Sequence, residues 1–172
     1  MNAPTTIDVA DLLRRVQRLE AIREIEQLKY RYWRACDRKD PETFRDCFIS
    51  KGADIDYGII GKFKDREPLV QIFTQVALAK TEQGAWLVHD VHHGKHPTIE
   101  FVDERTANGQ WTLWFMQVNN KDKTVTQLSM DYDDVYVVED GRWKMAKSHV
   151  TPMTTLCFPF PAGGFTASIA VR

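Results

Sequence analysis

Four of the five histidines in the chain lie within eight consecutive residues, inside the stretch VHDVHHGKHPTIEF (residues 88–101). Imidazole does two kinds of chemistry in proteins: the neutral ring binds metal ions, and its ordinary pKa near neutrality lets it take up and release protons. The cluster of His89, His92, His93 and His96 is therefore the first candidate for a functional site. Whether these rings can act together depends on the secondary structure that carries them.

A metal site needs three or four ligands that converge on one point. On a helix, His89, His92 and His93 would share one face and could bind zinc. Gly94, Pro97 and the β-branched residues that follow favour a strand instead. On a strand, alternation sends His92 and His93 to opposite faces, so three ligands do not easily meet and we expect no metal. Two interpretations stay open: one catalytic histidine among bystanders, or four histidines that only pack or face solvent.

The residues before the cluster predict helices. Apolar residues recur at spacings of three and four between Asp8 and Cys36, which indicates a long amphipathic helix with one buried stripe. Asp40 can cap a second, short helix, and the proline after it suits a first helical position. Residues 53–65 alternate with period two and contain glycines, which is typical of a strand or an irregular hairpin. Helical spacing returns in residues 65–80.

From Gly84 onward the sequence changes character. Segments rich in aromatic and β-branched residues are separated by short turn-forming stretches, which predicts a meander of long antiparallel strands. The segments are residues 86–103, 105–120, 124–140 and 142–153. Helices followed by a strongly curved antiparallel sheet make an α+β domain in which the helices cover one face of the sheet. We expect a single domain over residues 1–172, with a core of about 10–150 and a packed tail over 151–172.

The composition narrows the class of protein. Of the 172 residues, 43% are hydrophobic and 27% charged, and a formal net charge of −1 gives no basic field for nucleic acid or an anionic membrane. No run of eighteen apolar residues occurs, and the N-terminal stretch lacks a signal-like apolar segment, so we expect a cytoplasmic protein. Cys36, Cys47 and Cys157 do not make a disulfide framework, and we expect free thiols in or near the core.

Three stretches of the chain resemble the SnoaL-like branch of the nuclear-transport-factor-2-like superfamily. They are IEQLKYRYWRACDRKDPETFRDCF (residues 25–48), VHHGKHPTIEF (91–101) and GRWKMAKSH (141–149). The resemblance spans about residues 10–150 and implies a cone-shaped α+β barrel. Within this branch the chain looks most similar to the hydroxysteroid dehydratases that include bile acid 7α-dehydratase, with scytalone dehydratase and hexachlorocyclohexane dehydrochlorinase more distant. This fold carries enzymes, binding modules and structural subunits alike.

The resemblance assigns roles to single residues. A tyrosine followed five positions later by an aspartate on the first helix matches Tyr32 and Asp37. A histidine seven positions before the first isoleucine of the long strand matches His92, and a tyrosine on the first strand matches Tyr57, a substrate-binding position. His93 is the reserve, because a shift of one residue exchanges the faces of a strand. Since Asp37 lies about 140° from Tyr32 around the helix, the two side chains can converge only where the helix loosens or ends near Asp37.

Two positions depart from the family pattern. Where the bile acid enzyme carries an acidic residue on the strand after the histidine, this chain has Phe115. Where that enzyme carries an arginine near the end of the last strand, this chain has Pro152. We therefore expect different contacts to the substrate or its leaving group, with Phe115 among the substrate-binding residues. His149 is close enough on the same strand to replace a lost polar contact.

The resemblance implies a cofactor-independent dehydratase. In that chemistry a histidine removes a proton from carbon, an aspartate orients the imidazole, and a tyrosine donates a hydrogen bond to the developing oxyanion. His92, Asp37 and Tyr32 would fill these roles without a cofactor or a metal. The expected substrate is a flat hydrophobic hydroxy-ketone such as a hydroxysteroid or bile acid derivative. The alternatives are a ketosteroid-type isomerase, and a non-catalytic module that binds hydrophobic ligands or serves as an oxygenase subunit.

Residues 105–120 indicate a second surface. Trp111 and Leu113 alternate with Trp114 and Met116, so both faces of this strand are partly apolar. One face can line a pocket while the other meets a further subunit, since an apolar patch exposed on a monomer is unfavourable. We expect a homo-oligomer, and the resemblance implies a trimer.

Overall fold

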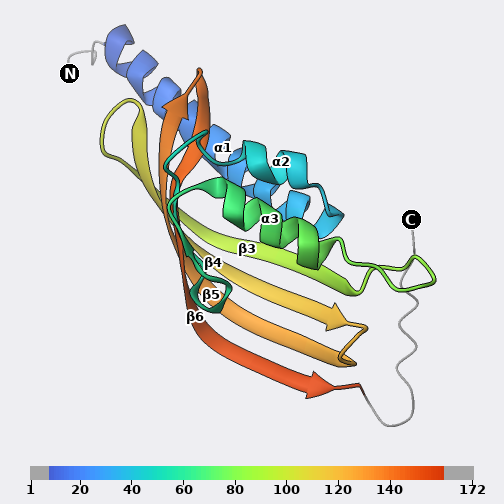
Figure 1. The fold of residues 1–172 in the computed structure, drawn as a ribbon. Coiled ribbons are helices and arrows are strands. Elements are labelled where there is room, and N and C mark those ends of the chain that lie inside the picture. Colours follow the sequence, from blue (N-terminus) through green and yellow to red (C-terminus); the bar gives the residue numbers. More distant parts are fainter. Residues whose placement is uncertain (1–7, 161–172) are drawn as a thin grey trace.

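The structure is a computed structural model that describes residues 8–160. Helices pack on one face of a six-stranded sheet, and Figure 1 shows α1, α2 and α3 side by side above the curved strands. The elements are α1 (Val9–Arg38), α2 (Pro41–Asp46), β1 (Asp54–Asp56), η1 (Gly58–Ile60), β2 (Lys62–Phe63), α3 (Arg66–Ala77), β3 (Val88–Phe101), β4 (Thr106–Asn119), β5 (Thr124–Glu139) and β6 (Arg142–Pro159). The predicted α+β class, with helices first, is confirmed.

The sheet has the strand order β2-β1-β6-β5-β4-β3. Strands β3 to β6 form the predicted antiparallel meander, and β1 and β2 form the predicted short hairpin. The expectation of an all-antiparallel sheet is wrong at one place, because β1 runs parallel to β6 and makes the sheet mixed. A parallel neighbour needs a long connection, and here about half of the chain separates the two strands. The sheet stays open between its edges, β2 and β3, so the cone does not close into a barrel.

Local signals at the helix ends agree with the structure. The side chain of Asp8 accepts a hydrogen bond from the backbone N–H of Ala10 at 3.0 Å and begins α1. The side chain of Asp40 accepts from the N–H of Thr43 at 3.0 Å, and a proline occupies the first turn of α2. Capping oxygens of this kind satisfy N–H groups that have no partner inside the helix. In the described part of the chain, no helix has the length and apolarity needed to cross a bilayer.

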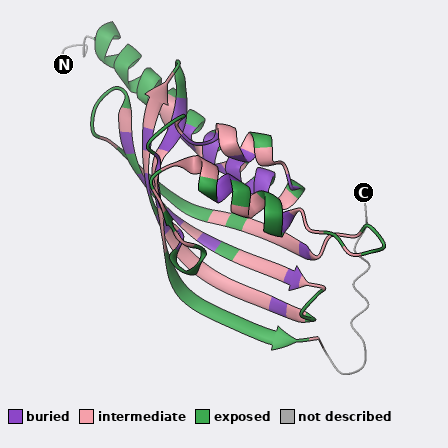
Figure 2. Cartoon of the chain, in the orientation of Figure 1, coloured by how far each residue is buried: buried purple, intermediate pink, exposed green. Residues whose placement is uncertain are grey.

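The core lies between the second half of α1 and the sheet. Ile25, Leu28 and Tyr32 form the predicted stripe and are almost fully buried, whereas the first half of α1 projects past the sheet and is exposed (Figure 2). The expectation of a packed tail is wrong for residues 151–159, which continue β6 and are exposed because no helix reaches that end of the sheet. Residues 161–172 lie outside the described residues.

The free cysteines also differ between the core under the helices and the uncovered end of β6. Cys36 and Cys47 are buried as predicted, on α1 and next to α2. The expectation fails for Cys157, which is exposed because it lies on the uncovered end of β6.

The long strands have two faces, which we call inner (toward the helices) and outer. On β3, Asp90 and His92 contact the end of α1 and therefore define the inner face, while Val91 between them points outward. Gly94 belongs to the inner face too: a Cβ atom there would lie 1.8 Å from the ring of Trp33, so a glycine lets α1 approach the strand. A bulge between Lys95 and Thr98 ends this regular alternation.

Candidate active site

Asp37 and His92 form a hydrogen-bonded pair between α1 and β3. His92 Nδ1 lies 2.6 Å from Asp37 Oδ1, and the backbone N–H of His92 donates to Asp37 Oδ2 at 3.3 Å. Because the Asp37 carboxylate contacts both the backbone and the ring of His92, it fixes the position of β3 at this residue and the rotation of the imidazole. The side chains of His92 and Asp37 are 13% and 28% exposed, so the pair is sheltered but reachable. With Nδ1 turned to the carboxylate, Nε2 is the nitrogen available to exchange a proton with a bound molecule.

The end of α1 brings an aspartate to face a strand. Asp37 lies in the last turn, and the helix ends one residue later at Arg38, as the sequence predicted. Lys39 then adopts the left-handed conformation with φ of 60°, and its N–H closes the helix by donating to the carbonyls of Ala35 and Cys36. Because the chain turns away at this point, the Asp37 side chain is free to reach β3 beside the helix.

An apolar wall stands beside the pair. The ring centroid of Phe115 lies 4.8 Å from that of His92 at an interplanar angle of 64°, and the two residues are register partners on β3 and β4. The same row continues with Leu128 on β5 and Thr155 on β6. Leu113, two residues from Phe115 on the same face, is fully buried. Within this row the imidazole therefore has an aromatic and an aliphatic side chain as its nearest neighbours, with the Thr155 hydroxyl at the far end.

Two tyrosines form a second polar group on the inner side. The Oη atoms of Tyr32 and Tyr57 lie 2.7 Å apart, and Tyr57 Oη lies 3.2 Å from Ser148 Oγ. Burial raises the pKa of Tyr32 and of Tyr57 well above the ordinary value. Both hydroxyls thus keep their protons near neutral pH. They can donate hydrogen bonds but cannot serve as bases.

The tyrosines and the acid–base pair share one helix. Tyr32 and Asp37 are five residues apart on α1, which corresponds to about 7.5 Å along the helix axis. The ring of Tyr32 is held by Phe44 and Phe48, with centroids 5.3 and 5.8 Å away. The acid–base pair thus lies at the end of the helix, and the buried hydroxyl pair lies about one and a half turns earlier.

Two of the predicted substrate-binding residues lie away from this group. His93 is exposed on the outer face, where its register partner is Trp114. His149 is also on the outer face, with Nε2 3.3 Å from Asp54 Oδ2. Alternation along β3 and β6 accounts for both placements. The structure thus brings together Asp37, His92 and Phe115, and separately the two tyrosines, but neither His93 nor His149 joins them.

Sequence reasoning missed two buried ion pairs beneath the inner face. Lys29 Nζ lies 2.6 Å from Asp134 Oδ2 and 3.7 Å from the ring centroid of Tyr132, with no exposed side-chain surface on either charged partner. Burial lowers the pKa of Lys29, and the charge of Asp134 opposes that shift. The sequence did indicate the first pair, because Lys29 lies on the apolar stripe of α1 and must be buried with it. The second pair joins Lys39 to Asp90, beside the acid–base pair.

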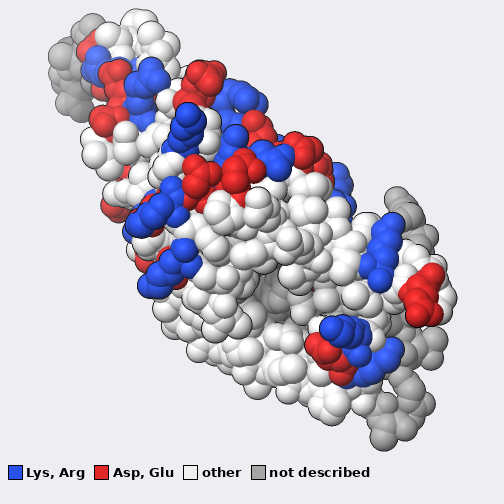
Figure 3. Space-filling view, in the orientation of Figure 1, with Lys and Arg blue, Asp and Glu red and all other residues white. Residues whose placement is uncertain are grey.

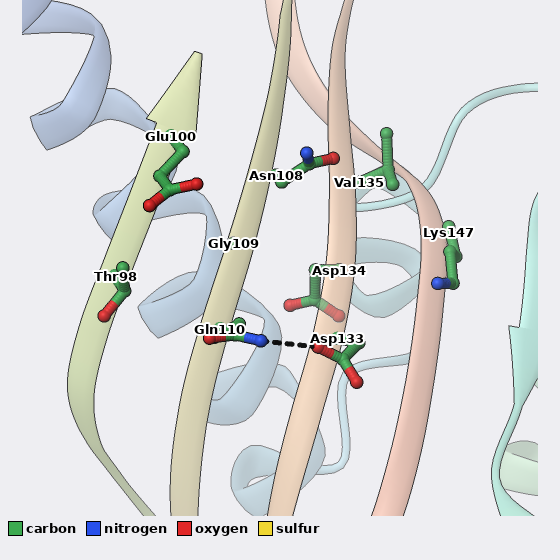
Figure 4. A pocket seen from close by; sticks show the side chains of 9 residues that line it. All are labelled: Thr98, Glu100, Asn108, Gly109, Gln110, Asp133, Asp134, Val135 and Lys147. Carbon is green, nitrogen blue, oxygen red and sulfur yellow. Dashed lines mark hydrogen bonds between the residues drawn. The ribbon is translucent and has the colours of Figure 1, made fainter. Parts of the chain in front are cut away.

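The described residues contain no group of three or more His, Cys, Asp or Glu side chains arranged to hold a metal ion. A separate hollow of about 360 Å³ lies on the sheet (Figure 4). It is lined by Thr98, Glu100, Asn108, Gly109, Gln110, Asp133, Asp134, Val135 and Lys147. Most of these side chains belong to the outer face, as the hydrogen bond from Gln110 to Asp133 illustrates. The hollow is therefore remote from the acid–base pair.

Charged side chains are unevenly distributed over the molecule. In Figure 3, Lys, Arg, Asp and Glu gather along the helices, while the surface between the helices and the long strands is hollowed and mostly uncharged. The contact of Phe115 with His92 adds to the apolar character of the inner face. The arrangement suits an apolar molecule better than a highly charged one.

A profile of the SnoaL-like domain matches residues 17–149, which is most of the chain. The chain belongs to the SnoaL-like domain family. The SnoaL-like assignment agrees with the architecture, a nuclear-transport-factor-2-like α+β fold with an open, curved sheet. No curated protein sequence matches the chain.

Solved structures support the SnoaL-like fold. A protein described as a candidate scytalone dehydratase from Novosphingobium aromaticivorans superposes with a TM-score of 0.72 at 20% identity, over 87% of this chain and 97% of that one. LinA superposes with a TM-score of 0.73 at 19% identity, over 88% and 97%. A LinA-type3 hexachlorocyclohexane dehydrochlorinase from Novosphingobium barchaimii gives 0.70 at 17%, over 83% and 93%. At these identities the likeness establishes the fold alone.

Proposed function

We propose that the protein is a cofactor-independent dehydratase, a carbon–oxygen lyase that removes water from a hydrophobic hydroxy-ketone. The observation that carries the proposal is the 2.6 Å contact between Asp37 and His92 Nδ1 on the inner face. A carboxylate in that position fixes the imidazole tautomer and stabilises the imidazolium that forms after proton uptake. Nε2 is then the base for a carbon acid made acidic by a ketone.

The reaction divides into two proton movements. His92 Nε2 takes a proton from the carbon next to the carbinol, and the electron pair moves toward the ketone oxygen, where negative charge develops. Tyr32, supported by Tyr57, donates a hydrogen bond to that oxygen, and such a bond is worth more in an apolar site than in water. The electron pair then returns and expels the hydroxyl group, which leaves as water with the proton carried by the imidazolium. The products are one unsaturated ketone and one water molecule.

The apolar wall supports a flat hydrophobic substrate. Phe115 lies against His92, and Leu113 and Leu128 extend the same face. We infer a hydroxysteroid or bile acid derivative, as for the dehydratases that the sequence resembles. The names of the structural neighbours, dehydratase and dehydrochlorinase, both denote elimination reactions, which agrees with a lyase.

The test is turnover of a panel of hydroxy-ketones that includes 7-hydroxy-3-oxo-4-ene steroids. Loss of water is followed by mass spectrometry and by the absorbance of the conjugated product. We expect elimination by the wild type, and a fall in kcat/KM of at least about 10³-fold in His92→Ala, because the base is lost. Circular dichroism checks that the variant folds. A double-bond shift without mass loss would indicate an isomerase, and binding without turnover a ligand-binding module; either result contradicts the proposal.

We also propose that the chain forms a homo-oligomer, most simply the trimer that the resemblance implies. Its support is the apolar outer face at the free ends of the strands, where Trp114, Leu156 and Phe158 are 40%, 54% and 42% exposed. Light scattering after size exclusion should give a multiple of 19.9 kDa. Leu156→Glu should dissociate it, whereas Ile59→Glu, at a fully exposed residue of η1, should not. A wild-type monomer refutes this assembly.

We also propose that the protein is located in the cytoplasm, as expected from the sequence. Imaging of the tagged chain would check this.

A further inference from the structure

A second polar link joins the end of α1 to β3, beside the acid–base pair. Lys39 Nζ contacts Asp90 Oδ2, and Gln117 Nε2 of β4 donates to Asp90 Oδ1 at 2.9 Å. The Lys39 and Asp90 side chains are only 3% and 10% exposed. Asp90 stands two residues before His92, and Lys39 two residues after Asp37. The same helix end is thus tied to the same face of the same strand at two successive points.

The backbone of Lys39 indicates that its side chain matters. Lys39 ends α1 with φ of 60°, a left-handed conformation in which side chains with a Cβ atom are strained and glycine is favoured. A glycine would close the helix without this strain. The lysine side chain instead reaches the buried carboxylate of Asp90, a contact that a glycine at this position could not make.

The charges of the two links lie close together. Burial raises the pKa of the Cys36 thiol well above the ordinary value; the negative charges of Asp37 and Asp90 raise it further, and the positive charge of Lys39 opposes them. A single thiol therefore senses both carboxylates and the ammonium group. Lys39 neutralises Asp90 within this cluster, which leaves Asp37 as the carboxylate directed at the imidazole.

We propose that Lys39, held by Asp90 and Gln117, is a positioning residue for the Asp37–His92 pair. The inference rests on the proposed function, because it concerns how the base of that reaction is held. One link alone would let the helix end rotate or slide against β3. Two links, two residues apart on both elements, restrain both movements and keep the carboxylate in contact with the ring, as an acid–base pair requires.

The test compares Lys39→Met, Asp90→Asn and the double variant by full pH–rate profiles. We expect each single variant to lower kcat by about 10- to 100-fold with KM within about twofold, since a misplaced base slows chemistry more than binding. The acidic limb of the profile should move to higher pH in Lys39→Met, where the Asp90 charge is uncompensated and favours the imidazolium. It should move to lower pH in Asp90→Asn, where an ammonium group is left.

The double variant separates charge from position. Its acidic limb should return toward that of the wild type while kcat stays low, and Lys39→Arg should restore part of kcat because it keeps the charge. The charges of Lys39 and Asp90 also act on Cys36 of α1, together with that of Asp37, and on His89 of the outer face of β3; these three residues are unchanged in all the variants. Should Lys39→Met fail to fold, Gln117→Leu removes a single donor to Asp90 and is expected to lower kcat by about two- to tenfold.

Lys144→Met is the control, because it breaks another ion pair made by a buried lysine, with Lys144 Nζ 2.6 Å from Oδ1 of the partly exposed Asp46, on the far side of the core. It should lower the thermal midpoint without moving the acidic limb. If Lys39→Met behaves in the same way, the link is structural and the positioning role is overturned.

A second readout needs no substrate: the NMR signal of the proton between Asp37 and His92 should be sharp in the wild type and broadened in Lys39→Met. A wild type that shows this signal but no turnover refutes the proposed function, and an unchanged signal in Lys39→Met refutes the positioning role.

Discussion

The two faces of β3 carry the same type of residue in opposite circumstances. On the inner face, His92 meets Asp37 at 2.6 Å beneath α1. One residue further along, His93 is exposed on the outer face and pairs in register with Trp114. The imidazoles are chemically identical, but only the inner one has a carboxylate to orient it and an apolar wall beside it. A histidine on a strand therefore gains a carboxylate partner and apolar neighbours from what packs on its face, and the number of histidines nearby does not predict which one gains them.

The strongest way to break this comparison is to change the partner of the inner histidine. Asp37→Asn keeps the shape of the side chain but removes the charge that stabilises the imidazolium, so we expect kcat to fall by about 10³- to 10⁴-fold. His93→Ala is the matched outer change and should alter kcat by less than about twofold. Both are measured with whichever hydroxy-ketone the wild type converts. Equal losses in the two variants would show that the faces do not differ in function.

The sequence predicted the inner half of this comparison well. Helical periodicity put Tyr32 on the buried stripe, strand alternation separated His92 from His93, and both follow from local geometry. The pairing of Asp37 with His92 came from the resemblance. Their separation of 55 residues along the chain cannot be bridged by a periodicity argument.

Other features depend on long-range packing and could not be predicted. The parallel pairing of β1 with β6 arises from how the chain returns after the helices, and it brings Asp54 to His149. Alternation along β6 puts His149 on the outer face, but only this pairing shows that His149 meets Asp54 there. The link between Lys39 and Asp90 requires a left-handed turn at a lysine, which propensity assigns to glycine. Such contacts become visible only when the elements are placed in space.

A smaller effect is expected where the inner face touches α1. Gly94→Ala adds a Cβ atom 1.8 Å from Trp33 Cζ3, and Trp33 is held edge-on by Trp111 at 5.4 Å. Overpacking against a ring that cannot move should destabilise the fold by about 1–3 kcal/mol. Urea unfolding measures the loss, with Lys95→Ala, at an exposed position, expected to stay within about 0.5 kcal/mol of the wild type. The double variant Trp33→Phe/Gly94→Ala should lose less than the sum of its two single changes. A fully stable Gly94→Ala would mean that α1 and β3 do not approach this closely.

The smallest expected effect concerns the outer face. His89 points away from α1, yet burial, followed by the charge of Lys39, lowers the pKa of its imidazole from 6.5, and its buried Nε2 has no hydrogen-bond partner among the described residues. Below pH 6.5 the unfolded chain therefore binds more protons at this residue than the folded protein does. The stability that comes from keeping His89 neutral is present above pH 6.5 and is lost as the pH falls through the lowered folded-state pKa. Thermal midpoints measured from pH 8 to pH 5 should thus fall more steeply in the wild type than in His89→Gln.

The control is His93→Gln, at an exposed outer position. Its midpoints should follow the wild-type slope, because the other titrating groups are common to all three proteins. Equal slopes in the wild type and His89→Gln would show that the outer face does not hold an imidazole in its neutral form.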